Sequence, residues 1–401
     1  MCCASRPSWK RFQEPVEAIG LVLQTCKRLA SETEAGYREG PLSRSVDTAS
    51  RFSSDLSSRC AAMAPKSESL QLSFPVLVGD IGGTNARFAQ LDGPDAPLHI
   101  YPTTATADHS GPAEAIEAIL ATSDRARPAS LVFALAGPVT GDHIKLTNCP
   151  WVFSPKDLIA GLGVENVILL NDFEAQALAL PSLASGDLRQ IGGGAVLQET
   201  TKVVVGPGTG LGVGILAYAE GLWIPIPGEG GHVTLAAETA RDREVWGHLA
   251  GIEGRITAES VLSGPGMFSL YNAVTRANGR EPCYQSPADI TAATSAGDTD
   301  VQETLALFGK HLGSLSGDFA LTALARGGVY IGGGVAKHME DTLASGPFRS
   351  AFEAKPPHRG LAASIPTFLI THPMPALIGL AAYASRPHAY GVDLKGRHWA
   401  R

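Results

Sequence analysis

Val76-Leu-Val-Gly-Asp80-Ile-Gly82-Gly83-Thr84-Asn85-Ala-Arg-Phe-Ala-Gln-Leu91 joins two apolar runs through a glycine-rich turn that carries a threonine. This pattern is typical of a β-hairpin. Glycine has no Cβ, so such a turn lets another group approach the backbone closely. Backbone N–H groups left unpaired in a turn form a concave anion site. The stretch predicts either an ordinary tight hairpin or a hairpin whose turn binds phosphate.

The same design occurs a second time. Val203-Val-Val-Gly206-Pro-Gly208-Thr209-Gly210-Leu-Gly212-Val-Gly-Ile-Leu-Ala217 again places glycines and a threonine between apolar runs. Two such hairpins in one chain predict two related domains that grip one polyphosphate. A third cluster, Gly332-Gly-Gly334, follows the strand expected over Val329-Tyr-Ile331. It is either a plain loop or a place where a flat adenine lies close to backbone.

Strands and helices alternate from Phe74 onward. Short apolar runs at Leu131–Ala136 and Val167–Leu170 predict buried strands. Helical spacing of apolar residues predicts helices over Ala113–Ala121 and Val301–Ala325, the second ending before Gly327-Gly328. This alternation predicts an α/β protein whose sheets are covered by helices.

Composition excludes several classes of partner. The 401 residues carry a net charge of −7 and form no basic stripe, which argues against nucleic acid and anionic membranes. Two long uncharged stretches, Val203–Ala219 and Ile365–Ser385, are broken by glycine or proline and fit strand–turn–strand or strand–turn–helix better than a membrane span. The six cysteines include no C-x-x-C pair or zinc-ligand spacing, which fits a reducing cytosol.

Residues 1–72 differ from the rest in being rich in serine and arginine. A secretory signal, a transit peptide and an extension without a structural role all compete as interpretations. We favour the third, a poorly structured extension over 1–72 with Met63 as a natural first residue of the functional protein. This leaves the role of residues 1–62 open.

Polar residues follow several of the predicted strands. Each of them has an ordinary interpretation as a helix cap, a solvated loop acid or a structural histidine. Together, carboxylates, an amide and an imidazole in glycine-rich loops make a cage suited to a polyhydroxylated ligand. The residues of this predicted sugar site are Asn171, Asp172, Glu229, His232 and Glu259.

Asp80 is a charged residue at the end of an apolar strand, where a carboxylate normally meets a cation or several donors. A Mg²⁺ held through water would satisfy it, because Mg²⁺ keeps most of its hydration shell. The spacing Gly212-Val-Gly214-Ile-Leu-Ala217 matches a relaxed dinucleotide fingerprint, but its glycines do not open a helix. The P-loop motif and the protein kinase motifs H-R-D and D-F-G are absent from the sequence.

Several segments of the chain resemble the bacterial-type glucokinases of the actin-like sugar kinase/Hsp70 superfamily. The matching segments occur in the family's order over about residues 75–388. They are Leu77–Arg87, Gly137–Asp142, Leu146-Thr-Asn148, Leu170–Glu174, Gly208–Gly212, Pro227–Val233, Ala258–Gly266 and Ile331–Gly334. The related ROK-type sugar kinases carry a cysteine-rich zinc motif, which this sequence lacks.

The resemblance implies an α/β, two-domain actin-like ATPase fold, also described as ribonuclease H-like, with a cleft between a small and a large domain. It implies a small domain over 75–181 plus 374–388 and a large domain over 182–373. The implied activity is ATP-dependent phosphorylation of D-glucose to glucose 6-phosphate, the first step of glycolysis. ATP and Mg²⁺ would be the cofactors, in a cytoplasmic homodimer.

The resemblance also implies a role for each matched residue. Asp172 matches the general base, and Asn171, Glu229, His232 and Glu259 match sugar-binding residues. The nucleotide-binding positions it implies are Gly79, Asp80, Ile81, Gly82, Gly83 and Thr84, then Gly208, Thr209 and Gly210, then Gly332, Gly333 and Gly334. No residue is implied as a direct metal ligand.

Three alternatives stay open. The chain could phosphorylate another hexose, or it could be a sugar and ATP sensor of the same fold that performs no turnover. A regulator needs a DNA-reading element, and residues 1–72 lack a convincing helix-turn-helix pattern. The third alternative, a chaperone-type ATP-driven module, leaves the polar cluster without a purpose.

Overall fold

The computed structural model describes residues 70–401 except 147, 148, 252 and 294–296. The extension predicted over residues 1–72 therefore lies outside the described residues up to position 69, as does Asn148 of the Leu146-Thr-Asn148 match. At the beginning of the described chain, Leu72 is buried in the core.

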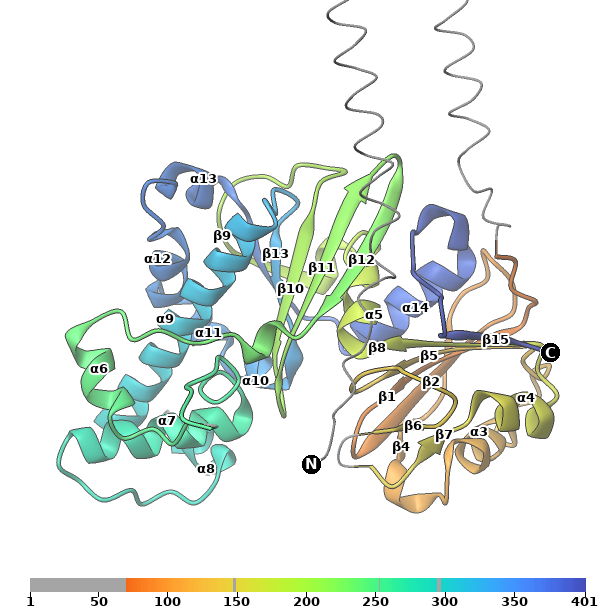
Figure 1. Ribbon diagram of the computed structural model, residues 1–401, viewed down its shortest axis with the longest axis horizontal. Coiled ribbons are helices and arrows are strands. Elements are labelled where there is room, and N and C mark those ends of the chain that lie inside the picture. The colour runs from red at the N-terminus through yellow and green to blue at the C-terminus, as the bar shows by residue number, and fades with distance from the viewer. Residues whose placement is uncertain (1–69, 147–148, 252, 294–296) are drawn as a thin grey trace, which may run out of the picture. The chain divides into compact units, whose positions relative to one another are not determined.

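Two mixed sheets form the framework (Figure 1). The first has the order β15-β8-β5-β1-β2-β3, with β4 also paired to β2, and the second has the order β12-β11-β10-β13-β14-β9. The strands of the first sheet are β1 (Val76–Ile81), β2 (Asn85–Leu91), β3 (His99–Ile100), β4 (Thr104–Ala105), β5 (Ser130–Leu135), β8 (Asn166–Asn171) and β15 (His398–Ala400). Those of the second are β9 (Leu188–Gly192), β10 (Lys202–Pro207), β11 (Leu211–Ala219), β12 (Leu222–Gly228), β13 (Val329–Ile331) and β14 (Thr367–Ile370). A separate pair consists of β6 (Ile144–Lys145) and β7 (Val152–Phe153).

The two sheets repeat one topology. In the first, β1 pairs antiparallel with β2 and parallel with β5, which is parallel to β8. In the second, β10 pairs antiparallel with β11 and parallel with β13, which is parallel to β14. Both predicted hairpins and the prediction of two related α/β halves are confirmed.

Helices cover both faces of the sheets (Figure 1). They are α3 (Pro112–Leu120), α4 (Pro155–Leu162), α5 (Asp172–Ala179), α6 (Ala240–Trp246), α7 (Gly264–Ala277), α8 (Pro287–Ala292), α9 (Thr299–Thr322), α10 (Gly333–His338), α11 (Glu340–Ala344), α12 (Pro347–Glu353), α13 (Arg359–Ser364) and α14 (Pro375–Ser385). Short 3₁₀ turns are η1 (Thr106–Asp108), η2 (Ser185–Asp187), η3 (Gly230–His232) and η5 (Pro387–Ala389).

Alternation along the strands divides the interior into three cores. Leu77 of β1 packs with residues of α3 and α4, whereas Val76 and Val78 face α5 and α14. In β10, Val204 joins that same middle core, and Val203 faces α7 and α9. Successive side chains of a strand point to opposite faces, so each sheet buries both faces. Because α5 and α14 pack in a core shared by both sheets, the boundaries at 75–181 plus 374–388 and at 182–373 stay a prediction.

The long helix differs slightly from its predicted range of Val301–Ala325. It begins after Asp298, whose side chain accepts from the amides of Asp300 and Val301, and it ends at Thr322. The end comes early because Leu324 has a left-handed φ of 47°, and the amide of Ala325 turns back to the carbonyl of Ala320 at 2.9 Å. Gly327 and Gly328 therefore follow the helix end rather than make it.

The two uncharged stretches form β10 with β11, and β14 with α14, as expected. In the part of the chain that the structure describes, no helix is both long enough and apolar enough to cross a membrane.

The C-terminal tail, which lies beyond the family-like segments, completes the first sheet. β15 pairs antiparallel with β8, and the carbonyl of Arg397 accepts from the amide of Leu169 at 3.0 Å. The Nε1–H of Trp399 donates to Asp142 at 3.1 Å. The tail thus covers the free edge of the strand that ends at Asn171.

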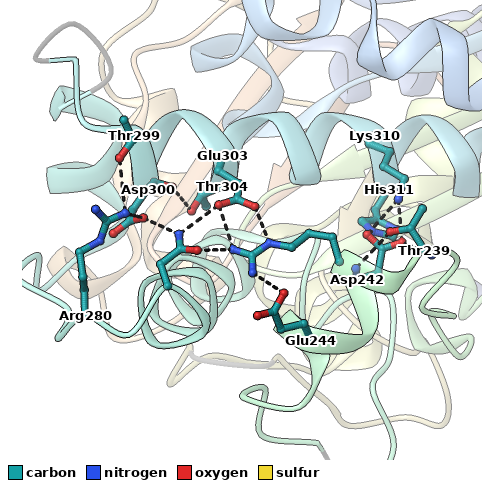
Figure 2. A network of polar contacts seen from close by, with 12 residues as sticks. Thr239, Asp242, Glu244, Arg280, Thr299, Asp300, Glu303, Thr304, Lys310 and His311 are labelled. Atoms are coloured by element: carbon teal, nitrogen blue, oxygen red, sulfur yellow. Dashed lines mark hydrogen bonds and ion pairs between the residues drawn. The ribbon is translucent and has the colours of Figure 1, made fainter.

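A buried polar network ties α6 to α9 (Figure 2). Asp242 is fully buried and accepts from Lys310 Nζ at 2.6 Å, from the amide of Thr239 at 2.8 Å, and lies 3.2 Å from His311 Nε2. Burial acts to raise the pKa of Asp242, but the Lys310 ammonium, the Thr239 hydrogen bonds and His311 outweigh it and lower that pKa strongly. The carboxylate is therefore charged in the folded protein.

The network continues along α9 and α7 (Figure 2). Arg241 donates to Glu303 at 2.7 Å, and Asn278 donates to Asp300 at 2.7 Å. Arg280 also pairs with Asp300. These contacts fix the helices that cover the outer face of the second sheet.

We expect Asp242→Asn to lower the free energy of unfolding by about 3 kcal/mol, because it leaves the Lys310 ammonium without its buried counter-ion. The stabilisation from Asp242 is fully present above the unfolded pKa of about 4 and is lost as the pH falls toward the lowered folded pKa. Urea unfolding at pH 7 and pH 3.5 measures both effects. Asp341→Asn, at an exposed acid, is the control, and an equal loss in both variants would contradict the prediction.

Candidate active site

The first predicted phosphate turn, Gly82-Gly83-Thr84, joins β1 to β2. Thr106 holds it: the Thr106 hydroxyl donates to the carbonyl of Gly83 at 2.8 Å, and its amide donates to the carbonyl of Thr84 at 3.0 Å. Within the described residues, the amides of Gly83 and Thr84 donate to no protein acceptor. The turn therefore offers two N–H groups to a ligand.

Gly79 and Ile81 are buried, unlike the residues of that turn. Gly79 is buried inside β1, where a Cβ would come within 2.8 Å of the Phe133 ring. Ile81 is buried in the core under α3 and α4. Packing alone explains the residue type at both of these predicted nucleotide-binding positions.

Asp80 and Asp172 form an acidic pair. Asp80 lies opposite Arg87 across the hairpin and accepts from its Nη1 at 3.2 Å. Burial raises the pKa of Asp80, and Arg87 only partly opposes that effect. Burial, and then the nearby negative charge of Asp80, raise the pKa of Asp172 to about 6. The structure therefore brings one predicted phosphate-binding residue within electrostatic reach of the predicted base.

Local geometry places Asp172 at the first position of α5. Asn171 caps this helix, because its Oδ1 accepts from the amides of Phe173 at 2.9 Å and Glu174 at 3.3 Å. The amide of Phe173 also donates to Asp172 Oδ1 at 3.0 Å. Asn171 Nδ2 donates to the carbonyl of Gly137 at 3.3 Å, and the Asn171 side chain also acts to lower the pKa of Asp172, against the effect of burial.

Glu174 completes the capping box from inside the protein. Its buried carboxylate accepts from the amide of Asn171 at 3.4 Å and from Arg397 Nη1 at 2.5 Å. Burial raises the pKa of Glu174, and the Arg397 guanidinium acts against this. A tail residue thus supports the helix turn that carries Asp172, although 223 positions separate Arg397 from Glu174.

The second predicted phosphate turn, Gly208 to Gly210, lies between β10 and β11. The carbonyl of Gly208 accepts from the amide of Gly264, at the start of α7, at 2.8 Å. Glu259 Oε2 accepts from the amide of Leu211 at 2.8 Å. The structure therefore places a predicted sugar-binding carboxylate directly beside a predicted phosphate turn.

The other predicted sugar-binding residues lie around η3. The amide of Glu259 donates to the carbonyl of Gly231 at 2.8 Å, which holds η3 against the loop of Glu259. His232 Nε2 lies 3.9 Å from Glu229 Oε2, and both side chains are more than half exposed. Glu229, His232 and Glu259 are thus grouped, whereas no hydrogen bond or ion pair joins any of them to Asp172 within the described residues.

The third glycine cluster begins a helix and is not a plain loop. Gly332 caps α10, and its amide donates to the carbonyl of Val205 at 2.9 Å. Gly333 has a φ of 83°, and a Cβ there would overlap the carbonyl of Pro207 at the end of β10. Gly332, Gly333 and Gly334 therefore lie against the second hairpin, next to its turn.

Two residues that contact this site were not predicted. The ring of Phe173 lies against β10 and β11, and Arg397 reaches Glu174 from the tail. Phe173 directly follows the predicted base, so its position in the sequence was a usable signal. For Arg397 the sequence holds no local signal.

The side chains available as ligands limit how a metal ion could be bound. In the described part of the chain, no group of three or more histidine, cysteine, aspartate and glutamate side chains is placed to bind one. Asp80 uses Oδ2 in its pair with Arg87 and keeps a second carboxylate oxygen. This arrangement fits an ion that is bound mainly by a ligand's phosphates and by water.

Comparison with known proteins identifies relatives over most of the chain. The family model described as glucokinase matches residues 77–387. A glucokinase of Agrobacterium fabrum (strain C58) is 47% identical over 339 residues, which is 84% of this chain and 99% of that protein. A glucokinase of Rhizobium meliloti (strain 1021) is 48% identical and covered in full, over 84% of this chain. The crystal structure of a glucokinase from an Antarctic psychrotroph aligns with a TM-score of 0.70 at 34% identity, over 77% of this chain and 98% of that one.

We expect Arg397→Met to lower the free energy of unfolding by about 3 kcal/mol at pH 8, because Glu174 is left buried without a counter-ion. The loss should be smaller at pH 5. Without Arg397 the folded pKa of Glu174 rises further above its unfolded value, so protonation relieves the buried charge at low pH and the penalty grows as the pH rises. Urea unfolding at both pH values measures this difference.

Lys395→Met removes the same charge from an exposed position in the same tail, and it is the matched control. The prediction is wrong if the two variants lose equal stability, or if the loss in Arg397→Met does not depend on pH.

Proposed function

The chain belongs to the glucokinase family and phosphorylates glucose with ATP, and we propose that Asp172 is the general base that takes the proton from the 6-hydroxyl. The product is then glucose 6-phosphate, and the reaction opens glycolysis. Phosphoryl transfer asks the protein mainly to align the two substrates and to neutralise charge. The burial of Asp172 within electrostatic reach of Asp80, in the strand that leads into the turn with two free amides, supports this role best.

A pKa of about 6 suits a general base near neutral pH. At pH 7 most of the carboxylate is ionised, and it binds a proton more strongly than an ordinary aspartate does. The burial of Asp172 and the negative charge of Asp80 both raise the pKa of Asp172. As the sugar oxygen attacks the terminal phosphate, Asp172 would accept the hydroxyl proton and orient the nucleophile.

Glucose would be held by Asn171, Glu229, His232 and Glu259. Each glutamate can accept from two sugar hydroxyls, and His232 can donate or accept. The hydrogen bond of Glu259 to the amide of Leu211 supports this, because it ties the sugar site to the phosphate turn. A site that hydrogen-bonds hydroxyls discriminates strongly against sugars that lack them.

ATP would be bound by the three glycine segments. The turn at Gly82 to Thr84 and the turn at Gly208 to Gly210 would take the β- and γ-phosphates, and Gly332 to Gly334 would lie along the adenosine. Mg²⁺ would neutralise charge on the phosphates, with Asp80 holding it through water. We also propose that the protein is a homodimer in the cytoplasm, as the family resemblance implies.

Asp172→Asn should lower kcat for glucose by at least about 100-fold while the fold is kept, because the amide cannot accept the proton. ADP formation from Mg-ATP and glucose measures the rate, and circular dichroism checks the fold. Asp157→Asn, at an exposed acid of α4, is the control. Wild-type turnover in Asp172→Asn would remove this residue from the role, and parallel assays with mannose, fructose and N-acetylglucosamine would reveal a different preferred hexose.

We expect kcat/KM to fall on the acid side of about pH 6, because protonated Asp172 cannot act as a base. Asp80→Asn removes a negative charge that raises the pKa of Asp172, so the midpoint of this acid limb should move to lower pH. The position of the limb, rather than the height of the profile, is the readout. An acid limb that stays in place in Asp80→Asn would contradict the coupling of the two carboxylates.

A further inference from the structure

One face of the second hairpin carries only backbone over three positions. Gly206 of β10 lies directly opposite Gly212 of β11 in the strand register. Gly214 lies two residues further along β11, and alternate residues of a strand share a face. None of these three glycines belongs to the turn at 208–210. A role in binding phosphate therefore leaves their residue type unexplained.

The aromatic ring of Phe173 fills this bare face. A Cβ on Gly206 would come within 2.5 Å of the Phe173 Cζ, and a Cβ on Gly212 would overlap its Cδ2 and Cε2. A Cβ on Gly214 would come within 2.7 Å of the Phe173 carbonyl oxygen and 3.3 Å of the Ala177 Cβ. The first two turns of α5 thus lie directly on the hairpin backbone, at a separation that only glycine allows.

The backbone of Phe173 also contacts the reacting end of the site. Its amide donates both to Asn171 Oδ1 and to Asp172 Oδ1, at 2.9 and 3.0 Å. The ring of Phe173 therefore contacts the hairpin that carries Gly208 to Gly210, while its N–H holds the carboxylate of Asp172. A shift of the ring on the glycines would therefore move Asp172 relative to the phosphate turn.

We propose that Phe173 is a positioning residue, whose ring on Gly206 and Gly212 sets the separation between the Asp172 carboxylate and the second phosphate turn. This inference rests on the proposed role of Asp172 as the base. In this interpretation Gly206, Gly212 and Gly214 contact Phe173. Contact with phosphate is made by the turn at Gly208 to Gly210. Phosphoryl transfer is sensitive to such spacing, because a misplacement of 1 Å can lower the rate by about 100-fold.

The test is a double-mutant cycle between positions 212 and 173, read as kcat and as separate KM values for glucose and ATP. Gly212→Ala should lower kcat about tenfold or more, because its methyl group pushes the ring and α5 away from the hairpin. Phe173→Ala should lower kcat at least about fivefold, because the ring no longer fixes the spacing. Both KM values should stay within about threefold of wild type, since no group that binds either substrate is removed.

The combined variant separates positioning from general destabilisation. Once Phe173 is alanine, the added methyl at 212 meets no ring, so Gly212→Ala should change kcat less than about twofold in that background. Gly360→Ala, at a helical glycine where a Cβ meets no atom within 4 Å, is the control for the substitution itself. Activities are normalised to the folded fraction. If Gly212→Ala does not fold, Phe173→Ala alone carries the test through its kcat and KM values.

Wild-type kcat in Phe173→Ala would overturn the proposal, and so would an equal effect of Gly212→Ala with and without the ring. A loss of thermal stability with unchanged kcat would overturn it as well. Asp172→Asn is measured in parallel to keep the two claims apart. If Asp172→Asn stays active, the assignment of the base fails. If Asp172→Asn is inactive and positions 173 and 212 show no coupling, only the positioning role of Phe173 fails.

Discussion

The structure of the site depends on the close contact between the first turn of α5 and the second hairpin. Phe173 lies on the paired glycines Gly206 and Gly212, and the amide of the same residue holds Asp172. On its other side α5 packs against α14 in a core shared by both sheets. Because protein interiors are close-packed, this short helix has little room to move independently of either sheet.

The position of α5 also determines the pKa values of the carboxyl groups in the site. Asp172 is buried near Asp80, and both carboxyl groups have raised pKa values. Arg87 offsets part of this charge, and Arg397 stabilises Glu174 behind the helix turn. The site therefore keeps a partly buried base of increased basicity within electrostatic reach of Asp80. Such an arrangement is stable only because each buried carboxylate has a specific cationic partner or hydrogen-bond donors.

Local sequence patterns predicted much of this fold. Both hairpins, the strand over Val329–Ile331 and the long helix were predictable, because apolar periodicity and glycine turns act over short stretches. The predicted end of that helix was wrong by a few residues, since Leu324 adopts the left-handed conformation that glycine usually supplies. The pairing of Arg397 with Glu174 was not predictable, because long-range contacts leave no local pattern. The packing of Phe173 on Gly206 and Gly212 was not predictable either, since one sequence cannot reveal which side chain faces a given strand.

In the proposed mechanism, the Asp172 carboxylate and the phosphate turns face one sugar site. The most direct measurement is a crystal structure of the protein with glucose and a non-hydrolysable ATP analogue. The Asp172 carboxylate should lie within hydrogen-bond distance of the 6-hydroxyl, about 2.6–3.2 Å, with Glu229, His232 and Glu259 on the other hydroxyls. Glucose bound away from Asp172, or a terminal phosphate on the far side of the sugar from the 6-hydroxyl, would contradict it.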